Sequence, residues 1–318
     1  VKLSTEHYVF PALYCNLKRA KFLHYLPEEL ADYMKHITDL NRERNFQIIE
    51  QAKEINELLI ANNITPIFLK GTSNLLSGLY EDIAERMIGD IDFIVKKCYG
   101  SKALKILSEN QYILQSKSAI QIGYIKHYPR LIKKGSISAI EIHREMTLER
   151  YVSVFNYQTI KSNLRKVNAF ALLAHKHQIT HTIINKQLND YGYLHQNIAL
   201  RNYYDIYLLS FKENTLKSII EFPEVFKQLN SFLALSSLVF PNSKSIYFKE
   251  NPKVTRYKNS TLKLLDYPSL HKKRTHLFKS YNKANKRVKI LIKALFKKVY
   301  FKYVIDKLVN KLLNFFKI

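Results

Sequence analysis

Tryptophan is absent from this sequence, and cysteine and glycine are scarce, with two and seven residues. Cys15 and Cys98 lie too far apart to show the spacing of a metal site, and a single pair makes no disulfide framework. So few glycines exclude collagen-like and flexible low-complexity chains. A reducing, cytoplasmic compartment is the simplest expectation.

Long apolar runs are also lacking. The longest, residues 232–240, contains two serines and is far shorter than the roughly 20 residues that a membrane-spanning helix needs. The opening VKLSTEHYVF lacks the charged start, apolar centre and small-residue cleavage site of a signal peptide. We therefore expect a folded cytoplasmic protein, with any membrane contact confined to the inner surface of the membrane.

Acidic residues are few: 26 Asp and Glu face 51 Lys and Arg, which gives a net charge of +25. The excess is uneven, because residues 251–318 hold 19 Lys and Arg but only 2 Asp and Glu, a net charge of +17. The preceding 250 residues carry only +8. The end of the chain is therefore a distinct basic unit.

The first half of the chain mixes helical and strand patterns. Residues 27–63 show helical spacing of apolar residues, and residues 64–69 fit a short buried strand. Residues 90–95 alternate strictly between two sides, which is the period of a strand. Residues 101–110 are typical of a helix, and residues 112–146 contain several β-type runs. The order predicts an α/β or α+β head with a mixed sheet.

After about residue 150 the pattern becomes helical. Helices are predicted within residues 170–186 and 198–211, and residues 283–318 form a strong amphipathic helical pattern. We therefore predict a mostly helical C-terminal half. The predicted parts are a head (1–150), a helical domain (151–250) and a basic amphipathic tail (251–318).

Asp90 and Asp92 interrupt an apolar strand with two carboxylates on the same face. Like charges side by side are unfavourable unless a basic partner or a cation lies between them. Mg²⁺ binds carboxylate oxygens and keeps sites free for water and phosphate. The pair is therefore a candidate clamp for a metal–nucleotide complex, although a solvated strand face is an equal alternative for Asp-x-Asp alone.

The preceding segment favours the nucleotide interpretation. Lys70-Gly71-Thr72-Ser73 stands where a strand meets a helix start, so its N–H groups and hydroxyls are available to phosphates. Gly71 allows close approach of the backbone. Lys70 and Arg86 would neutralise phosphate charge, Arg86 in bidentate fashion.

A third acid is expected on a later strand. In ISAIEIHREM, Ile140 and Ile142 alternate with Glu141 and His143, so Glu141 stands on the polar side of a strand. A third carboxylate would complete a metal site or accept a proton from an acceptor hydroxyl. Glu145 is the alternative third acid.

Together these stretches resemble the DNA polymerase β-like nucleotidyltransferase superfamily. More narrowly, LKGTSNLLSGLYEDIAERMIGDIDFIV followed by HYPRLIKKGSISAIEIHREM is similar to a bacterial family of uncharacterised nucleotidyltransferases, over about residues 40–210. The positions that match the family pattern are Lys70-Gly71, Tyr80, Arg86, Asp90-Ile91-Asp92 and Glu141-Ile142-His143. The chain departs from the superfamily pattern at Thr72, where Gly or Ser is usual directly after the glycine.

The resemblance implies a nucleotidyltransferase-type head that uses Mg²⁺, or Mn²⁺ in its place. It implies transfer of a nucleotidyl group from a nucleoside triphosphate, with release of pyrophosphate, to an acceptor that it does not name. A sugar, a lipid-linked glycan, a protein or an RNA end would each serve. Asp90, Asp92 and Glu141 would hold the metal, with Lys70 or Arg86 stabilising the phosphate charge.

Three further residues, His143, His177 and Asp205, are candidates for lining the substrate cleft. For His177, packing between two helices is the main alternative. A nucleotidyltransferase toxin that modifies tRNA is an alternative function, as is a non-catalytic protein of the same fold that binds polyanions or a membrane surface.

The basic tail has three possible roles. Apolar residues recur at helical spacing from residue 288, and Lys286, Lys289, Lys293 and Lys297 share the opposite side. One alternative is a final helix packed on the body with a solvated basic face. The second is peripheral binding of residues 283–318 to an anionic membrane. The third is binding to RNA or another polyanion.

Overall fold

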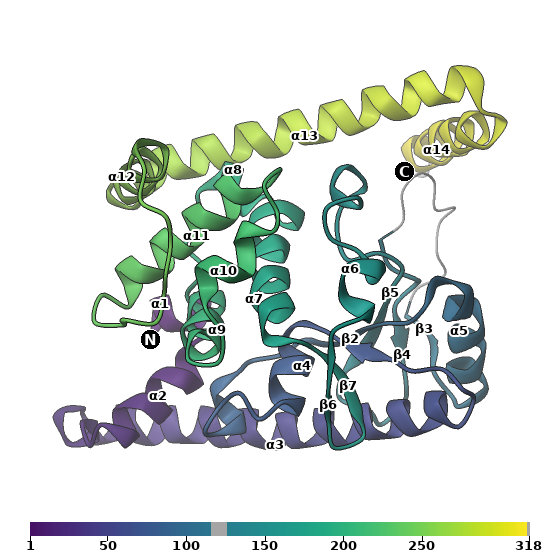
Figure 1. The fold of residues 1–318 in the computed structure, drawn as a ribbon. Helices are drawn as coiled ribbons and strands as arrows, with labels where there is room; N and C mark the ends of the chain where they lie inside the picture. The colour runs from purple at the N-terminus through teal and green to yellow at the C-terminus, as the bar shows by residue number, and fades with distance from the viewer. Residues whose placement is uncertain (116–125, 317–318) are drawn as a thin grey trace.

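The computed structural model describes residues 1–115 and 126–316 (Figure 1). The chain opens with helices α1 (Lys2–Glu6), α2 (Phe10–Arg19) and α3 (Glu28–Ile60). Helix α3 is 33 residues long and carries Glu28 and Glu29 in its first turn. Negative charge at this end stabilises a helix through its interaction with the helix dipole. Its buried side follows helical spacing through Ile48, Ala52, Ile55 and Leu59. The helix predicted within residues 27–63 is confirmed.

A mixed sheet forms the centre of the head. Its strands are β1 (Ile67–Phe68), β2 (Asp90–Ile94), β3 (Ile113–Leu114), β4 (Leu131–Ile132), β5 (Ala139–His143), β6 (Leu164–Val167) and β7 (Phe170–Leu173). They form one seven-stranded sheet in the order β3-β4-β5-β2-β1-β7-β6. Strand β2 runs parallel to β5 and antiparallel to β1. The predicted fold class, a head with a mixed sheet followed by a mostly helical half, is confirmed.

Alternation along the central strands separates the two faces of the sheet. Ile91 and Phe93 of β2 lie in one buried cluster with apolar residues of α3 and of α5 (Gly100–Glu109). Ile94 lies in a second cluster, which contains most of the buried apolar residues of the helical half. Asp90 and Asp92 alternate with Ile91 and Phe93, so their side chains project from the face opposite α3 and α5.

Strands β6 and β7, which lie after residue 150, belong to the same sheet as β1–β5. The predicted division of the chain into three parts stays a prediction. The helix predicted within residues 170–186 is wrong at its start. Phe170–Leu173 is strand β7, which pairs in parallel with β1, and helix α7 begins at His175.

The helices between the first strand and the basic end of the chain are α4 (Lys70–Leu76), α6 (Tyr157–Lys161), α7 (His175–Ile184), α8 (Gly192–His195), α9 (Leu200–Ser210), α10 (Thr215–Ile220) and α11 (Phe226–Val239), together with α5 given above. Shorter helical turns are η1 (Leu23–Tyr25), η2 (Ile83–Glu85), η3 (Lys97–Tyr99), η4 (Glu149–Tyr151) and η5 (Asn185–Asn189).

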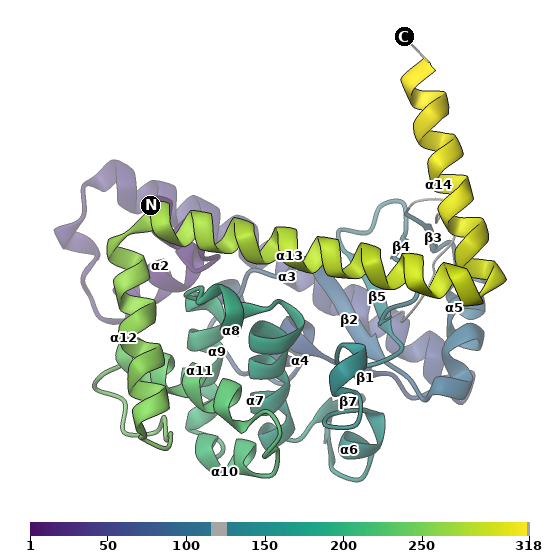
Figure 2. The ribbon, with the colours of Figure 1, turned by 90° about the horizontal axis from the view of Figure 1, so that it is seen from above.

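The basic end of the chain folds into three helices, α12 (Pro252–Asp266), α13 (Pro268–Phe296) and α14 (Lys298–Phe316). Helix α13 runs across the top of the molecule in Figure 1, and α14 turns away from the body in Figure 2. The bend between them falls at Lys297, whose backbone is extended (φ −134°, ψ 110°). Among the described residues, no helix combines the length and apolar character that a bilayer crossing requires.

Candidate active site

Two of the predicted acids lie side by side. Asp92 of β2 is paired in register with Glu141 of β5, and these two strands are parallel neighbours. Both side chains project from the face opposite α3 and α5, because their neighbours Ile91, Phe93 and Ile142 belong to the core on the other face. The structure therefore brings together two carboxylates that are 49 positions apart in the chain.

A lysine ammonium lies between these carboxylates. Lys70 Nζ is 2.6 Å from Asp92 Oδ1 and 3.8 Å from Glu141 Oε2. Lys70 is the first residue of α4 and has a φ of +53°, a left-handed conformation that non-glycine residues rarely adopt. Such backbone strain persists where surrounding contacts hold it, often at functional sites. The Lys70–Asp92 ion pair is one contact that holds Lys70 in this backbone conformation.

The charges of this group depend on one another. Burial acts to raise the pKa of Asp92, but the Lys70 ammonium and a hydrogen bond from His143 together bring the pKa well below its ordinary value. Burial acts to lower the pKa of Lys70, but the Asp92 carboxylate raises it above its ordinary value. The pKa of Glu141 is raised by burial and by the nearby Asp92 carboxylate. Asp92 and Lys70 are thus a charged pair at neutral pH.

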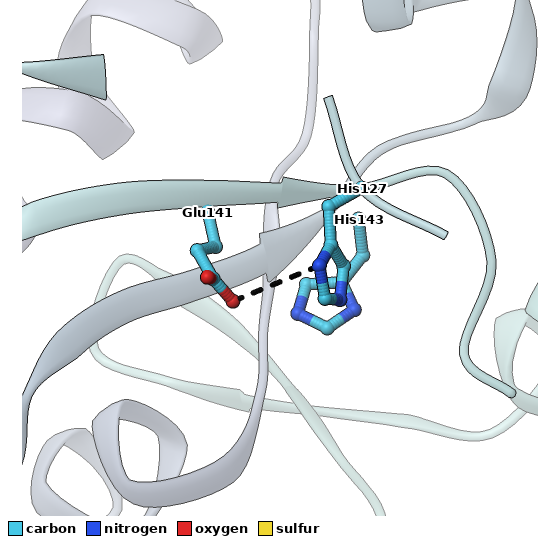
Figure 3. Close-up of side chains that lie close together, drawn as sticks. All are labelled: His127, Glu141 and His143. Carbon is cyan, nitrogen blue, oxygen red and sulfur yellow. Dashed lines mark ion pairs between the residues drawn. The ribbon is translucent and has the colours of Figure 1, made fainter. Parts of the chain in front are cut away.

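Two histidines adjoin the same carboxylates, and Figure 3 shows them beside Glu141. His143 Nε2 lies 2.8 Å from Asp92 Oδ1, and His127 Nδ1 lies 3.9 Å from Glu141 Oε2. The two rings meet edge to face with centroids 4.3 Å apart. Burial lowers the pKa of His143 to about 4 and that of His127 to about 2, so both rings are neutral at pH 7. One donor atom each from His127, Glu141 and His143 lies within 4.8 Å of the other two, a spacing that could hold a metal ion.

Asp90, at the start of β2, has a partner that the sequence did not indicate. Arg130 Nη2 forms an ion pair with Asp90 Oδ1. Lys126 also belongs to this region, because burial and the Lys70 charge lower its pKa to about 8. Lys126, His127 and Arg130 come from one short segment, KHYPR. Its density of basic residues just before a strand is the signal that could have pointed to it.

The segment after β1 packs tightly against β2. Thr72 Oγ1 donates a hydrogen bond to the Asp90 carbonyl (3.2 Å) and accepts one from the Asp92 N–H (3.4 Å). A Cβ atom at Gly71 would come within 3.0 Å of the Ile88 side chain, so close packing here requires glycine. The Ser73 hydroxyl is buried and has no hydrogen-bond partner in the part of the chain that the structure describes. Phosphate contacts of Gly71, Thr72 and Ser73 stay predictions.

Arg86 lies in a different set of contacts. Its Nε donates to Asp205 Oδ1 at 3.0 Å and its Nη2 lies 3.0 Å from Oδ2. The Tyr80 hydroxyl donates to the same carboxylate at 2.7 Å. The side chains of Arg86 and Asp205 are only 7% and 2% exposed. This buried pair joins the loop before β2 to helix α9. Arg86 would therefore have to leave Asp205 in order to bind a phosphate. Its predicted contact with the nucleotide stays a prediction.

Of the predicted cleft residues, only His143 is in contact with the acids described above. His177 lies at the start of α7, and its ring packs edge to face against Phe155 at 6.0 Å. Asp205 is engaged by Arg86 and Tyr80. The roles of His177 and Asp205 in the cleft stay predictions. Glu145, the alternative third acid, lies past the end of β5, where its Oε1 is 3.4 Å from Lys97 Nζ.

A neighbouring histidine makes the stability of the fold sensitive to acid. His181 of α7 is 1% exposed; its Nε2 accepts a hydrogen bond from Asn185 at 2.9 Å. Burial first, then the nearby His143 ring, and then the positive charges of Lys126 and Lys70 bring its pKa well below the ordinary value of 6.5. Below about pH 6.5 the unfolded chain therefore binds a proton at this residue that the folded chain does not.

We expect the free energy of unfolding contributed by His181 to be complete above pH 6.5 and to fall by about 1.4 kcal/mol per pH unit below it. Urea unfolding at several pH values between 5 and 8 measures this slope. His181→Gln should flatten the acid side of the curve, and His36→Gln on the exposed surface of α3 serves as the matched substitution. An unchanged slope in His181→Gln would show that this residue titrates normally in the folded state.

Known proteins resemble this chain in sequence and in structure. The family model described as an uncharacterised nucleotidyltransferase matches residues 1–240. The crystal structure of JHP933 from Helicobacter pylori is similar over 74% of this chain and 97% of that chain, with 12% identical residues and a TM-score of 0.31. No curated protein matches the sequence.

Proposed function

Because the chain belongs to the family of uncharacterised nucleotidyltransferases, we propose that it transfers a nucleotidyl group from a nucleoside triphosphate to an acceptor hydroxyl or phosphate, releasing pyrophosphate. The observation that carries the proposal is the in-register pair of Asp92 and Glu141 with the Lys70 ammonium between them. Two carboxylates on one face, beside groups of opposite charge, suit a substrate that arrives as a metal–phosphate complex.

The donor set fits a hard divalent cation. Asp90, Asp92 and Glu141 offer carboxylate oxygens, which Mg²⁺ and Mn²⁺ prefer. Lys70 Nζ already lies within 4 Å of oxygens from both Asp92 and Glu141, so the space between these two side chains accommodates a positive charge. We therefore propose that Asp90, Asp92 and Glu141 hold Mg²⁺, or Mn²⁺ in its place.

The bound metal would supply positive charge to the triphosphate and to the departing pyrophosphate. Lys70 and Arg130 now neutralise the acids, and these same cations would bind phosphate oxygens once the acids have another partner. Neutral His143 donates its Nε2–H to Asp92 and so fixes the orientation of that carboxylate. Each of these chain residues thus has a role before any acceptor is bound.

In the transfer step, a bond forms between the acceptor oxygen and the α-phosphorus as the bond from that phosphorus to pyrophosphate breaks. Where the acceptor is a hydroxyl, its proton passes to the Glu141 carboxylate. A sugar, a lipid-linked glycan, a protein side chain or an RNA end would each provide the attacking oxygen. A tRNA-modifying toxin would carry out the same chemistry on an RNA end.

Nucleotide binding is the direct test of the proposal. A ligand that binds only the folded state stabilises it, by about 2.7 kcal/mol at a concentration one hundred times Kd. We expect the melting temperature to rise with at least one of the four common nucleoside triphosphates when Mg²⁺ or Mn²⁺ is present. Without the metal the rise should be small, and in Asp92→Asn it should be absent.

Asp32→Asn is the matched control, because Asp32 is an exposed aspartate of α3. This variant should respond to nucleotide and metal as the wild-type protein does. If no triphosphate raises the melting temperature with metal present, or if Asp92→Asn responds equally, the proposed site is wrong. The non-catalytic polyanion-binding alternative would then be favoured.

A further inference from the structure

The basic side of helix α13 faces the body of the protein. Lys283, Lys286, Lys289 and Lys293 follow helical spacing and line a pocket of about 630 Å³. The opposite wall of this pocket comes from residues 148–150 and Tyr191. The lysines therefore border a hollow between helix and head, and Figure 1 shows α13 passing above the helical half and the sheet.

The apolar side of the same helix is exposed. No residue of α13 is buried, and Leu291, Ile292, Leu295 and Phe296 are between 52% and 81% exposed. The packed final helix considered from the sequence would bury these side chains and leave the lysines in solvent. In the structure the apolar residues lie in solvent instead, and the lysines line the pocket, with Lys283, Lys286 and Lys289 still exposed.

The exposed apolar surface continues past the bend at Lys297. Val299 is 62% and Phe301 57% exposed, and both lie in the first turn of α14. Figure 2 shows α14 leaving the body at this point. We call this surface the elbow patch; it consists of Leu291, Ile292, Leu295, Phe296, Val299 and Phe301. Large apolar side chains exposed together at one bend mark a site of interaction.

We propose that the elbow patch docks on the surface of an anionic phospholipid membrane. Helix α13 contains nine Lys and Arg residues and no Asp or Glu, and Lys297, Lys298 and Lys302 flank the patch and are exposed. Aliphatic and aromatic side chains would enter the boundary between headgroups and acyl chains. Lys297, Lys298 and Lys302 would meet the negative headgroups, with their aliphatic stems along the apolar layer.

Charge and side-chain chemistry favour this partner over two others. A second copy of the chain would bring the same positive helices together, which is unfavourable without many counterions. Nucleic acid would satisfy the lysines and could stack on Phe296 and Phe301, but the four aliphatic side chains of the patch offer no stacking surface to bases. An anionic bilayer satisfies both the apolar and the basic residues of the elbow.

The proposal is independent of nucleotidyl transfer, and vesicle binding by the 318-residue chain tests it. We expect the protein to sediment with phosphatidylcholine vesicles that contain about 30% phosphatidylglycerol, and to remain in solution with phosphatidylcholine alone. Added salt should weaken binding, because part of the attraction is electrostatic. Leu291→Ser/Leu295→Ser/Phe296→Ser should lower the partition coefficient about tenfold or more.

The matched control is Leu40→Ser/Phe46→Ser/Ile60→Ser, which removes three exposed apolar side chains from α3. It should bind vesicles as the wild-type protein does, and circular dichroism and thermal unfolding verify that both triple variants are folded. Equal vesicle binding by wild type and the elbow variant would overturn the proposal, as would no binding at low salt. Tight binding to single-stranded RNA without vesicle binding would favour nucleic acid instead. A concentration-dependent dimer that the elbow variant loses would favour a second copy.

Discussion

Replacing Arg86 with leucine is expected to lower the free energy of unfolding by roughly 3–5 kcal/mol, because it leaves the buried Asp205 carboxylate without its cation. The two side chains are 7% and 2% exposed, and the guanidinium contacts both carboxylate oxygens. Only the Tyr80 hydroxyl would then remain to satisfy Asp205 through a side-chain contact described here. Urea unfolding of the purified variant measures the loss.

Arg42→Leu provides the matched comparison. Arg42 also pairs with an aspartate, Asp82, but these side chains are 38% and 31% exposed. For a pair of this kind we expect a loss of about 0–1 kcal/mol. The double variant Arg86→Leu/Asp205→Leu should recover part of the loss seen in Arg86→Leu, because it removes the uncompensated charge. Similar losses for Arg86→Leu and Arg42→Leu would contradict the structural role of the buried pair.

The Arg86 prediction shows where sequence reasoning on charge stops. An arginine four residues before Asp90 is close enough in the chain to serve the same substrate. The spacing does not reveal that Asp205, more than 100 positions later, supplies a buried carboxylate for it. Tertiary packing decides which of two acids an arginine binds, and the residues around the arginine in the sequence do not show it.

The fold was predictable where one face of an element is buried and the other is not. Strand β2 alternates apolar and acidic residues, and α3 has a clear apolar stripe, so both were recognised. Strand β7 was not recognised, because its residues run directly into α7 and no turn residue separates them. Buried strands and buried helix ends are both continuously apolar, and periodicity alone does not distinguish them.

The candidate site was predictable to a similar degree. Alternation placed Asp92 and Glu141 on the polar side of their strands, and the pairing of β2 with β5 then brought them into register. Arg130 and Lys126 were missed because the sequence shows only that the segment before β4 is basic, and tertiary packing decides that it lies beside Asp90 and Lys70. The amphipathic pattern of α13 was visible in the sequence. The pattern does not show which side of the helix faces the body, because tertiary packing sets that orientation.

The second large effect is expected at Glu141. Glu141→Gln should slow pyrophosphate release from the preferred triphosphate by about 10²–10⁴-fold, because the acceptor's proton would lose its base and the metal one carboxylate. Glutamine keeps the size of the side chain, so the fold and the Asp92–Lys70 pair should persist. Release of pyrophosphate under single-turnover conditions, with water as acceptor where no other is supplied, provides the measurement.

Glu145→Gln is the matched control, since it is the same substitution at the other acid proposed from the sequence. Glu145 contacts Lys97, a side chain 82% exposed, outside the pair formed by Asp92 and Glu141. This variant should retain activity within about twofold of wild type, because Glu145, although only 17% exposed itself, pairs with a largely solvated lysine, and such an ion pair contributes little. If Glu145→Gln were the inactive variant and Glu141→Gln the active one, the third acid would lie past the end of β5. The register of β2 with β5 would then position Glu141 for the charge balance of Lys70 rather than for catalysis.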